Sequence, residues 1–107
     1  MRDFSYYYAE SESGDRIDDP SQDALFVMIE ELERDENTFV VVQPERERPD
    51  WYVSVTISDE SGYEIVRYDS KTGEHIVTVD DDVDRISADI TVWMAARVAE
   101  REPFSSS

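Results

Sequence analysis

Four short runs of β-branched and aromatic residues lie between positions 38 and 79 and are separated by turn signals. They are Phe39–Val42, Trp51–Ile57, Tyr63–Tyr68 and His75–Val79, and their composition is typical of β-strands. The last two connections between them are short and end in Gly62 and Gly73. Glycine accepts the positive φ that the last residue of such a hairpin loop needs. The pattern therefore predicts an antiparallel meander.

The run from Trp51 to Ile57 has the clearest alternation. One face of this extended segment carries Trp51, Val53, Val55 and Ile57, and the other carries Tyr52, Ser54 and Thr56. A strand with a single apolar face is buried on that side alone. We therefore expect one face of the sheet to be covered and the other to be wet or open to a partner.

Apolar residues at helical spacing predict a helix on each side of the meander in the sequence. The first helix ends near residue 35 and has an apolar stripe of Leu25, Met28, Ile29 and Leu32. At its start Asp19 is the predicted cap, Pro20 takes the first helical position and Gln22 completes a capping box. The second stripe follows the Asp80–Asp82 triplet and comprises Val83, Ile86, Ile90, Trp93, Met94 and Val98. Pro103 ends that helix.

The N-terminal run Phe4–Tyr8 is aromatic and predicts an additional edge strand, and the polar run Glu10–Asp18 predicts an exposed loop. The element order is then β-α-β-β-β-β-α. It indicates an α+β fold, a four- to five-stranded antiparallel meander sheet with two helices packed on one face. We expect a single domain over residues 1–107, in which residues 1–18 form the N-terminal strand and loop and residues 103–107 form a frayed tail.

Charge changes this picture more than any motif does. The chain has 27 acidic and 10 basic residues and a formal net charge of −17. Such a surface repels nucleic acid and anionic lipid, and it attracts basic proteins. Three explanations stay open: a surface that faces a basic protein, a mimic of the phosphate array of DNA, or the proteome-wide acidity of a halophilic or GC-rich organism. The single lysine supports the third explanation.

The sequence offers few groups for catalysis. It has no cysteine, and its single histidine, His75, lies in a predicted strand with no nucleophile motif nearby. The Asp80–Asp82 triplet has oxygen ligands for a hard cation, but capping of the second helix explains it more simply. We therefore expect no enzyme activity, no catalytic residue, no metal, no cofactor and no direct binding of nucleic acid. No apolar run suits a signal peptide or a membrane span, so we expect a cytoplasmic protein that does not bind membranes.

Several spacings along the chain are similar to those of a known group. They are Leu25-x-x-Met28-Ile29-x-x-Leu32, Asp35–Phe39, Trp51-Tyr52, Gly62–Tyr68, His75 and Trp93. Over residues 19–98 the chain resembles the Imm1-type immunity proteins of polymorphic toxin systems and related small acidic actinobacterial proteins. Arg67 stands where that group has an acidic residue. The resemblance implies a protein that binds and neutralises a cognate toxin by occlusion, without a catalytic residue.

The expected function is that of a non-enzymatic acidic binding protein, an immunity-type inhibitor that occludes a basic effector or toxin. The residues expected to contact this partner are Glu30, Glu31, Glu33, Asp80, Asp81 and Asp82, with Trp51 and Tyr68 as aromatic anchors. The alternatives are a DNA mimic that blocks a DNA-binding host enzyme and an acidic domain whose charge is proteome-wide. Edge strands at Phe4–Tyr8 and at the end of the meander also leave a homodimer open.

Overall fold

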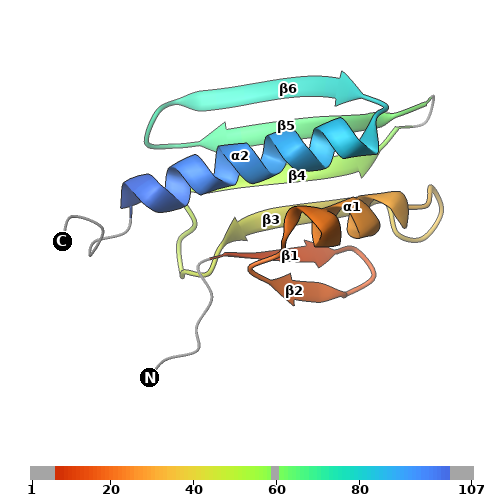
Figure 1. The fold of residues 1–107 in the computed structure, drawn as a ribbon, viewed down its shortest axis with the longest axis horizontal. Helices are drawn as coiled ribbons and strands as arrows, with labels where there is room; N and C mark the ends of the chain where they lie inside the picture. The colour runs from red at the N-terminus through yellow and green to blue at the C-terminus, as the bar shows by residue number, and fades with distance from the viewer. Residues whose placement is uncertain (1–6, 59–60, 102–107) are drawn as a thin grey trace.

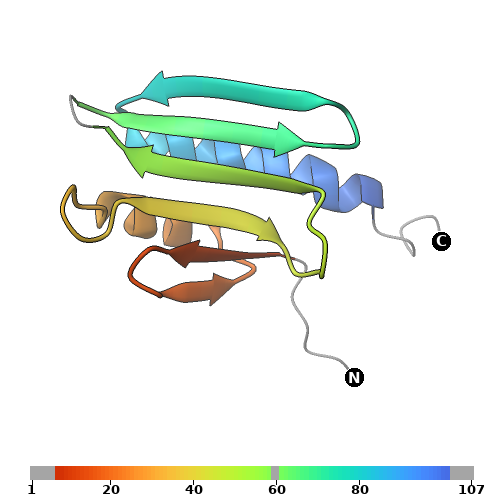
Figure 2. The same cartoon turned by 180° about the vertical axis from the view of Figure 1, so that it is seen from behind.

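The computed structural model describes residues 7–58 and 61–101 and shows an α+β fold of two layers. A six-stranded antiparallel sheet is covered on one face by both helices (Figure 1), and its other face is uncovered (Figure 2). The strands are β1 (Tyr7–Ser11), β2 (Arg16–Asp18), β3 (Phe39–Pro44), β4 (Trp51–Ile57), β5 (Tyr63–Asp69) and β6 (Glu74–Asp80), and the helices are α1 (Gln22–Glu30) and α2 (Val83–Arg101). The order across the sheet is β2-β1-β3-β4-β5-β6.

The predicted meander is confirmed. Strands β3 to β6 follow one another in chain order, and each pairs antiparallel with the next. Strands β4 and β5 pair over their full length, from Trp51 opposite Asp69 to Ile57 opposite Tyr63. Gly62 has a φ of 81° and Gly73 a φ of 76°. Both hairpin turns therefore use the backbone region that favours glycine.

The N-terminal part of the sheet differs from the prediction, which gave four or five strands. Strand β1 lies between β2 and β3, so it is not an edge strand, and positions 4–6 of the predicted strand lie outside the described residues. Strand β2 falls within the run that was predicted as a loop. Ile17 is the one apolar side chain among its three residues, and so short an alternation gives no strand signal.

Helix α1 is shorter than predicted and begins at a different cap. Ser21 is the N-cap, and its hydroxyl accepts a hydrogen bond from Ala24 N at 3.1 Å. Asp19, the predicted cap, has a φ of 47°, and its carboxylate accepts a hydrogen bond from Tyr7 N at 3.3 Å. The helix ends at Glu30 with no basic residue in its last turn. Because the C-terminal end of a helix is unfavourable for carboxylates, the acidic residues that follow do not extend it to residue 35.

The hydrophobic core lies between the sheet and the two helices. Its buried apolar residues are Ala9, Leu25, Met28, Ile29, Leu32, Val40, Val42, Trp51, Val53, Val55, Ile65, Ile86, Ile90 and Met94. They include three of the four residues on the predicted inner face of β4, all four of the first helical stripe and three of the six of the second, so the predicted sides of these elements are confirmed. Each buried valine, leucine, isoleucine or methionine among them stabilises the fold by about 1.5–3 kcal/mol through burial.

An ion pair is buried beneath the C-terminal half of α2. The Asp69 side chain at the end of β5 has no exposed surface, and its Oδ2 accepts a hydrogen bond from Arg97 Nε at 3.0 Å. Arg97 also pairs with Glu74 on β6, and its guanidinium lies 3.7 Å from the centre of the Trp93 ring. These contacts fix α2 against the hairpin of β5 and β6.

Candidate functional site

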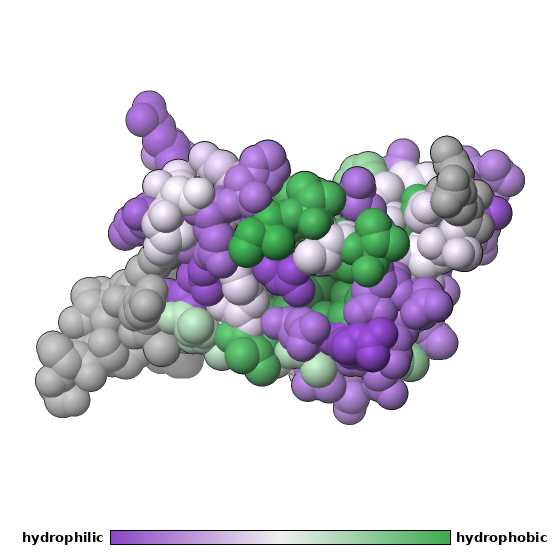
Figure 3. All heavy atoms as spheres, turned by 90° about the horizontal axis from the view of Figure 1, so that it is seen from above, coloured by the Kyte–Doolittle hydropathy of each residue, from purple (hydrophilic) through white to green (hydrophobic). Residues whose placement is uncertain are grey.

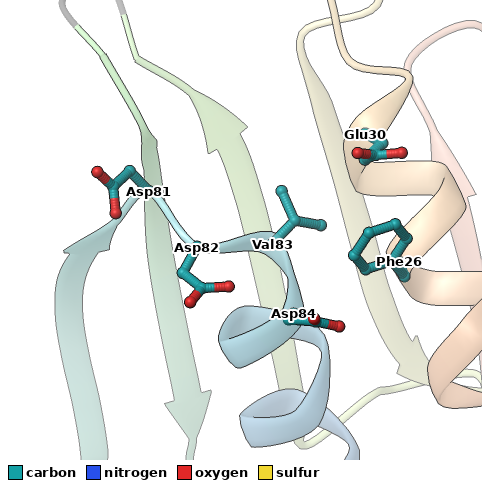
Figure 4. A pocket seen from close by; sticks show the side chains of 6 residues that line it. All are labelled: Phe26, Glu30, Asp81, Asp82, Val83 and Asp84. Carbon is teal, nitrogen blue, oxygen red and sulfur yellow. The ribbon is translucent and has the colours of Figure 1, made fainter.

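A shallow hollow of about 470 Å³, wide open to solvent, lies between α1 and the N-terminal end of α2. We call it the acidic hollow. It is lined by Phe26, Glu30, Asp81, Asp82, Val83 and Asp84. Figure 4 shows the Phe26 and Val83 side chains facing each other across the gap, with Glu30 and the aspartates on the two sides. The fold therefore brings together two acidic segments, the end of α1 and the connection after β6, that the sequence indicated separately.

Two members of the aspartate triplet support the start of α2. Asp82 caps the helix, because its Oδ1 accepts a hydrogen bond from Arg85 N at 3.2 Å. Asp80 binds the Arg85 guanidinium through two hydrogen bonds of 2.8 Å each and accepts a third from Asp82 N at 3.0 Å. These bonds, that of Arg85 above all, lower the pKa of Asp80 to about 2. The capping interpretation is confirmed, and Asp80 serves the helix start without lining the hollow.

Three carboxylates of the acidic hollow stay exposed to solvent. Glu30, Asp81 and Asp84 form no salt bridge within the part of the chain that the structure describes. They surround the apolar side chains of Phe26 and Val83. An arginine or lysine of a partner protein would pack its aliphatic stem on these two residues and direct its charged head to the carboxylates.

Glu31 and Glu33 are exposed but lie outside the hollow. Glu31 is the C-cap of α1. Glu33 belongs to the loop that follows, where its backbone N donates a hydrogen bond to Asn37 O at 2.8 Å. Both residues widen the acidic surface beyond α1, and neither contributes to the lining.

The expectation that Trp51 anchors a partner is corrected by its burial. Only 1% of Trp51 is exposed, on the face of β4 that the helices cover. Its ring lies 6.4 Å from that of Tyr7 and 5.7 Å from that of Trp93, measured between centroids. Trp51 is therefore a core residue of a central strand, and a partner has no access to it in the folded protein.

Tyr68 lies on the uncovered face of the sheet. Its ring stacks on Tyr52 at a centroid distance of 5.3 Å and meets His75 edge-on at 6.1 Å. Farther along the same face Tyr8 accepts a hydrogen bond from Gln43 Nε2 at 2.6 Å. Since the acidic hollow opens on the helical side, Tyr68 and the hollow do not form one continuous contact surface.

The sequence analysis missed three lining residues. Val83 was assigned to the apolar stripe of α2, and Phe26 and Asp84 were not singled out as site residues. The available signal was the spacing of Phe26 and Glu30, which are four positions apart and therefore neighbours on the surface of α1. A large apolar residue at the border of a core stripe, beside an acid, indicates a contact surface more specifically than acidic residues do alone.

The described residues contain no group of three or more histidine, cysteine, aspartate or glutamate side chains that is able to hold a metal ion. None of the helices in this part of the chain is long and apolar enough to cross a membrane. No protein family, curated protein or solved structure matches the chain. The class that the fold and the site define is that of a small α+β domain with an acidic hollow between its helices.

Proposed function

We propose that this protein is a non-enzymatic binding protein that neutralises a basic effector protein by occluding it, as an immunity-type inhibitor does. The acidic hollow is the observation that supports this function best. It places exposed carboxylates from two elements around an apolar pair, Phe26 and Val83. The net charge of −17 adds a long-range attraction that accelerates the encounter with a basic protein.

The acidic hollow would orient the bound effector more than it would raise the total binding affinity. An exposed ion pair contributes about 0.2–1 kcal/mol. Three such pairs, to Glu30, Asp81 and Asp84, together contribute about 0.6–3 kcal/mol, which corresponds to a factor of about 3–150 in the dissociation constant. The remaining affinity comes from the apolar contacts and from the area that the effector buries.

The test compares two triple variants that change the net charge equally. The hollow variant carries Glu30→Gln, Asp81→Asn and Asp84→Asn. The control variant carries Glu31→Gln, Glu33→Gln and Asp35→Asn, at exposed positions just beyond α1. The native protein is used to capture proteins from its host, and each basic protein captured is then titrated with all three forms. Its own activity is measured during the titration.

We expect the native protein to inhibit a captured basic effector and the hollow variant to bind it about 3–150-fold more weakly. The control variant keeps nearly the native affinity. Capture of no basic protein contradicts the proposed function. An equal loss in both triple variants shows that the overall charge acts and that the hollow is not the site. Displacement of the captured protein by duplex DNA supports the DNA mimic instead.

A further inference from the structure

Strand β6 is an unprotected edge of the sheet. Within the described residues it pairs with β5 alone. It carries three of the five exposed large hydrophobic residues found there, Ile76, Val77 and Val79, which are 40%, 52% and 70% exposed. Figure 3, which views the molecule from above and so from the β6 side, shows hydrophobic side chains gathered within a mostly hydrophilic surface.

Edge strands are usually kept from pairing by shortness, by charged side chains or by proline. Strand β2, at the other edge, follows this rule, since it has three residues and both Arg16 and Asp18 are exposed. Strand β6 has seven residues, and it contains neither lysine nor proline. A strand of this length with exposed valines is a template for pairing with another chain.

We propose that β6 pairs antiparallel with β6 of a second copy of this chain, so that two sheets join into one across a two-fold axis at Val77. Val77 is the middle residue of the strand, and an axis there pairs all seven residues. Val77 then lies opposite Val77 of the partner subunit, and Ile76 lies opposite Thr78 of the partner subunit. Directly opposed residues share a face, so the two copies of Val77 contact each other, and each Val79 packs beside His75 of the partner subunit on that same face.

The charges along β6 favour a second copy over the basic effector. The five residues from His75 to Val79 include no carboxylate. The carboxylates at the two ends are already engaged, Glu74 by Arg97 and Asp80 by Arg85. A basic segment therefore meets no unpaired carboxylate on the strand itself, whereas a second neutral apolar strand fits it.

Salt separates this proposal from the proposed function. Two copies of net charge −17 repel each other, and salt screens that repulsion beyond about 8 Å at physiological ionic strength. Dimerisation therefore strengthens as salt is added, because the β6 contact itself is neutral and apolar. Binding to a basic effector weakens under the same change, because it depends on attraction between opposite charges.

Sedimentation velocity of the full chain at about 50 mM and about 500 mM NaCl measures the dimer dissociation constant. We expect tighter dimers at the higher salt. Val77→Lys raises the dissociation constant about 100-fold, because it removes two buried valines and opposes two lysines, although it lowers the net negative charge. Val27→Lys is the matched control, since Val27 is 50% exposed on α1, and it leaves the dissociation constant unchanged.

Cross-linking provides a second readout in this cysteine-free chain. Directly opposed residues of antiparallel strands have Cα atoms about 4.5–5.5 Å apart, which suits a disulfide. Oxidised Val77→Cys is expected to form a covalent dimer, and Val27→Cys is not. A monomer at every concentration and at both salts overturns the proposal, as does equal cross-linking of the two cysteine variants or dimerisation of Val77→Lys with the native constant. Effector binding is unaffected in each of these cases, because the acidic hollow is intact.

Discussion

Substitution of Arg97 by methionine leaves the carboxylate of Asp69 buried without its cation. Asp69 has no exposed surface, and the Arg97 side chain is also largely buried. Removal of one member of a buried ion pair destabilises a protein by about 3–5 kcal/mol, because the remaining charge loses its counter-charge away from water; Asp69 keeps the hydrogen bond that Lys71 N donates to its Oδ1 at 2.9 Å. Domains of this size have unfolding free energies of about 5–15 kcal/mol, so we expect Arg97→Met to lose about a fifth of the stability or more.

Urea unfolding at neutral pH, followed by tryptophan fluorescence, measures this loss directly. In thermal unfolding 1 kcal/mol corresponds to about 4–5 °C for a chain of this length, so we expect the Tm to fall by about 12–25 °C. Arg46→Met is the matched control, because Arg46 pairs with Asp50 at 3.0 Å but is 44% exposed. Its expected effect is below about 1 kcal/mol.

The double variant Asp69→Asn and Arg97→Met separates charge from packing. It has a neutral side chain at position 69, so we expect it to be more stable than Arg97→Met alone. If the double variant is as unstable as the single one, the loss comes from the packing of Arg97 over Trp93. A loss of less than about 1 kcal/mol in Arg97→Met refutes the reasoning about the buried pair altogether.

Three further predictions concern the start of α2 and the turns beside it. Gly62→Ala is expected to lower the unfolding free energy by about 1–3 kcal/mol, and by more than Gly73→Ala does. Both glycines have positive φ, but a Cβ at position 62 would also lie 3.0 Å from Asp80 O. Urea unfolding of the two variants measures the difference. Asp82→Ala removes the cap of α2 and is expected to lower the same free energy by about 1 kcal/mol. Folding lowers the pKa of Asp80 from 3.8 to about 2. The stabilising effect of the Asp80 carboxylate is therefore complete above about pH 4 and is lost as the pH falls from about 4 to 2. Urea unfolding across this range is expected to show a smaller decrease of the unfolding free energy in Arg85→Met than in the native protein.

The parts of the fold that followed from sequence are those with long, consistent periodicity. The alternation from Trp51 to Ile57 predicted both the strand and its buried side, and the stripe beginning at Val83 predicted α2. The errors lie where a contact between distant residues, or an element too short to show a period, decides the structure. The carboxylate of Asp19 binds Tyr7 N across the chain, and no local pattern distinguishes this from a helix cap. Strand β2 is too short to show a period.

The candidate site was predictable in its charge but not in its location. The sequence indicated Glu30 and the aspartate triplet, yet it gave no reason to place them together, because their proximity depends on the packing of α1 beside α2. For the two predicted aromatic anchors, the sequence indicated the secondary structure but not the accessibility. Trp51 and Tyr68 both belong to predicted strands, and only the pairing of those strands and the position of the helices make the first buried and the second accessible.

The proposed dimer and the proposed inhibitor are linked by the geometry of the sheet. A two-fold axis that relates antiparallel neighbours in one sheet is perpendicular to that sheet, so the helices of both copies cover the same face. Both acidic hollows then open on one side of the dimer, because each hollow lies between helices that cover this face. A monomeric effector would therefore bind as two molecules per dimer, and a dimeric effector would gain avidity from both hollows at once. Light scattering of the complex checks this relation, because four chains are expected in the native complex and two in that of Val77→Lys.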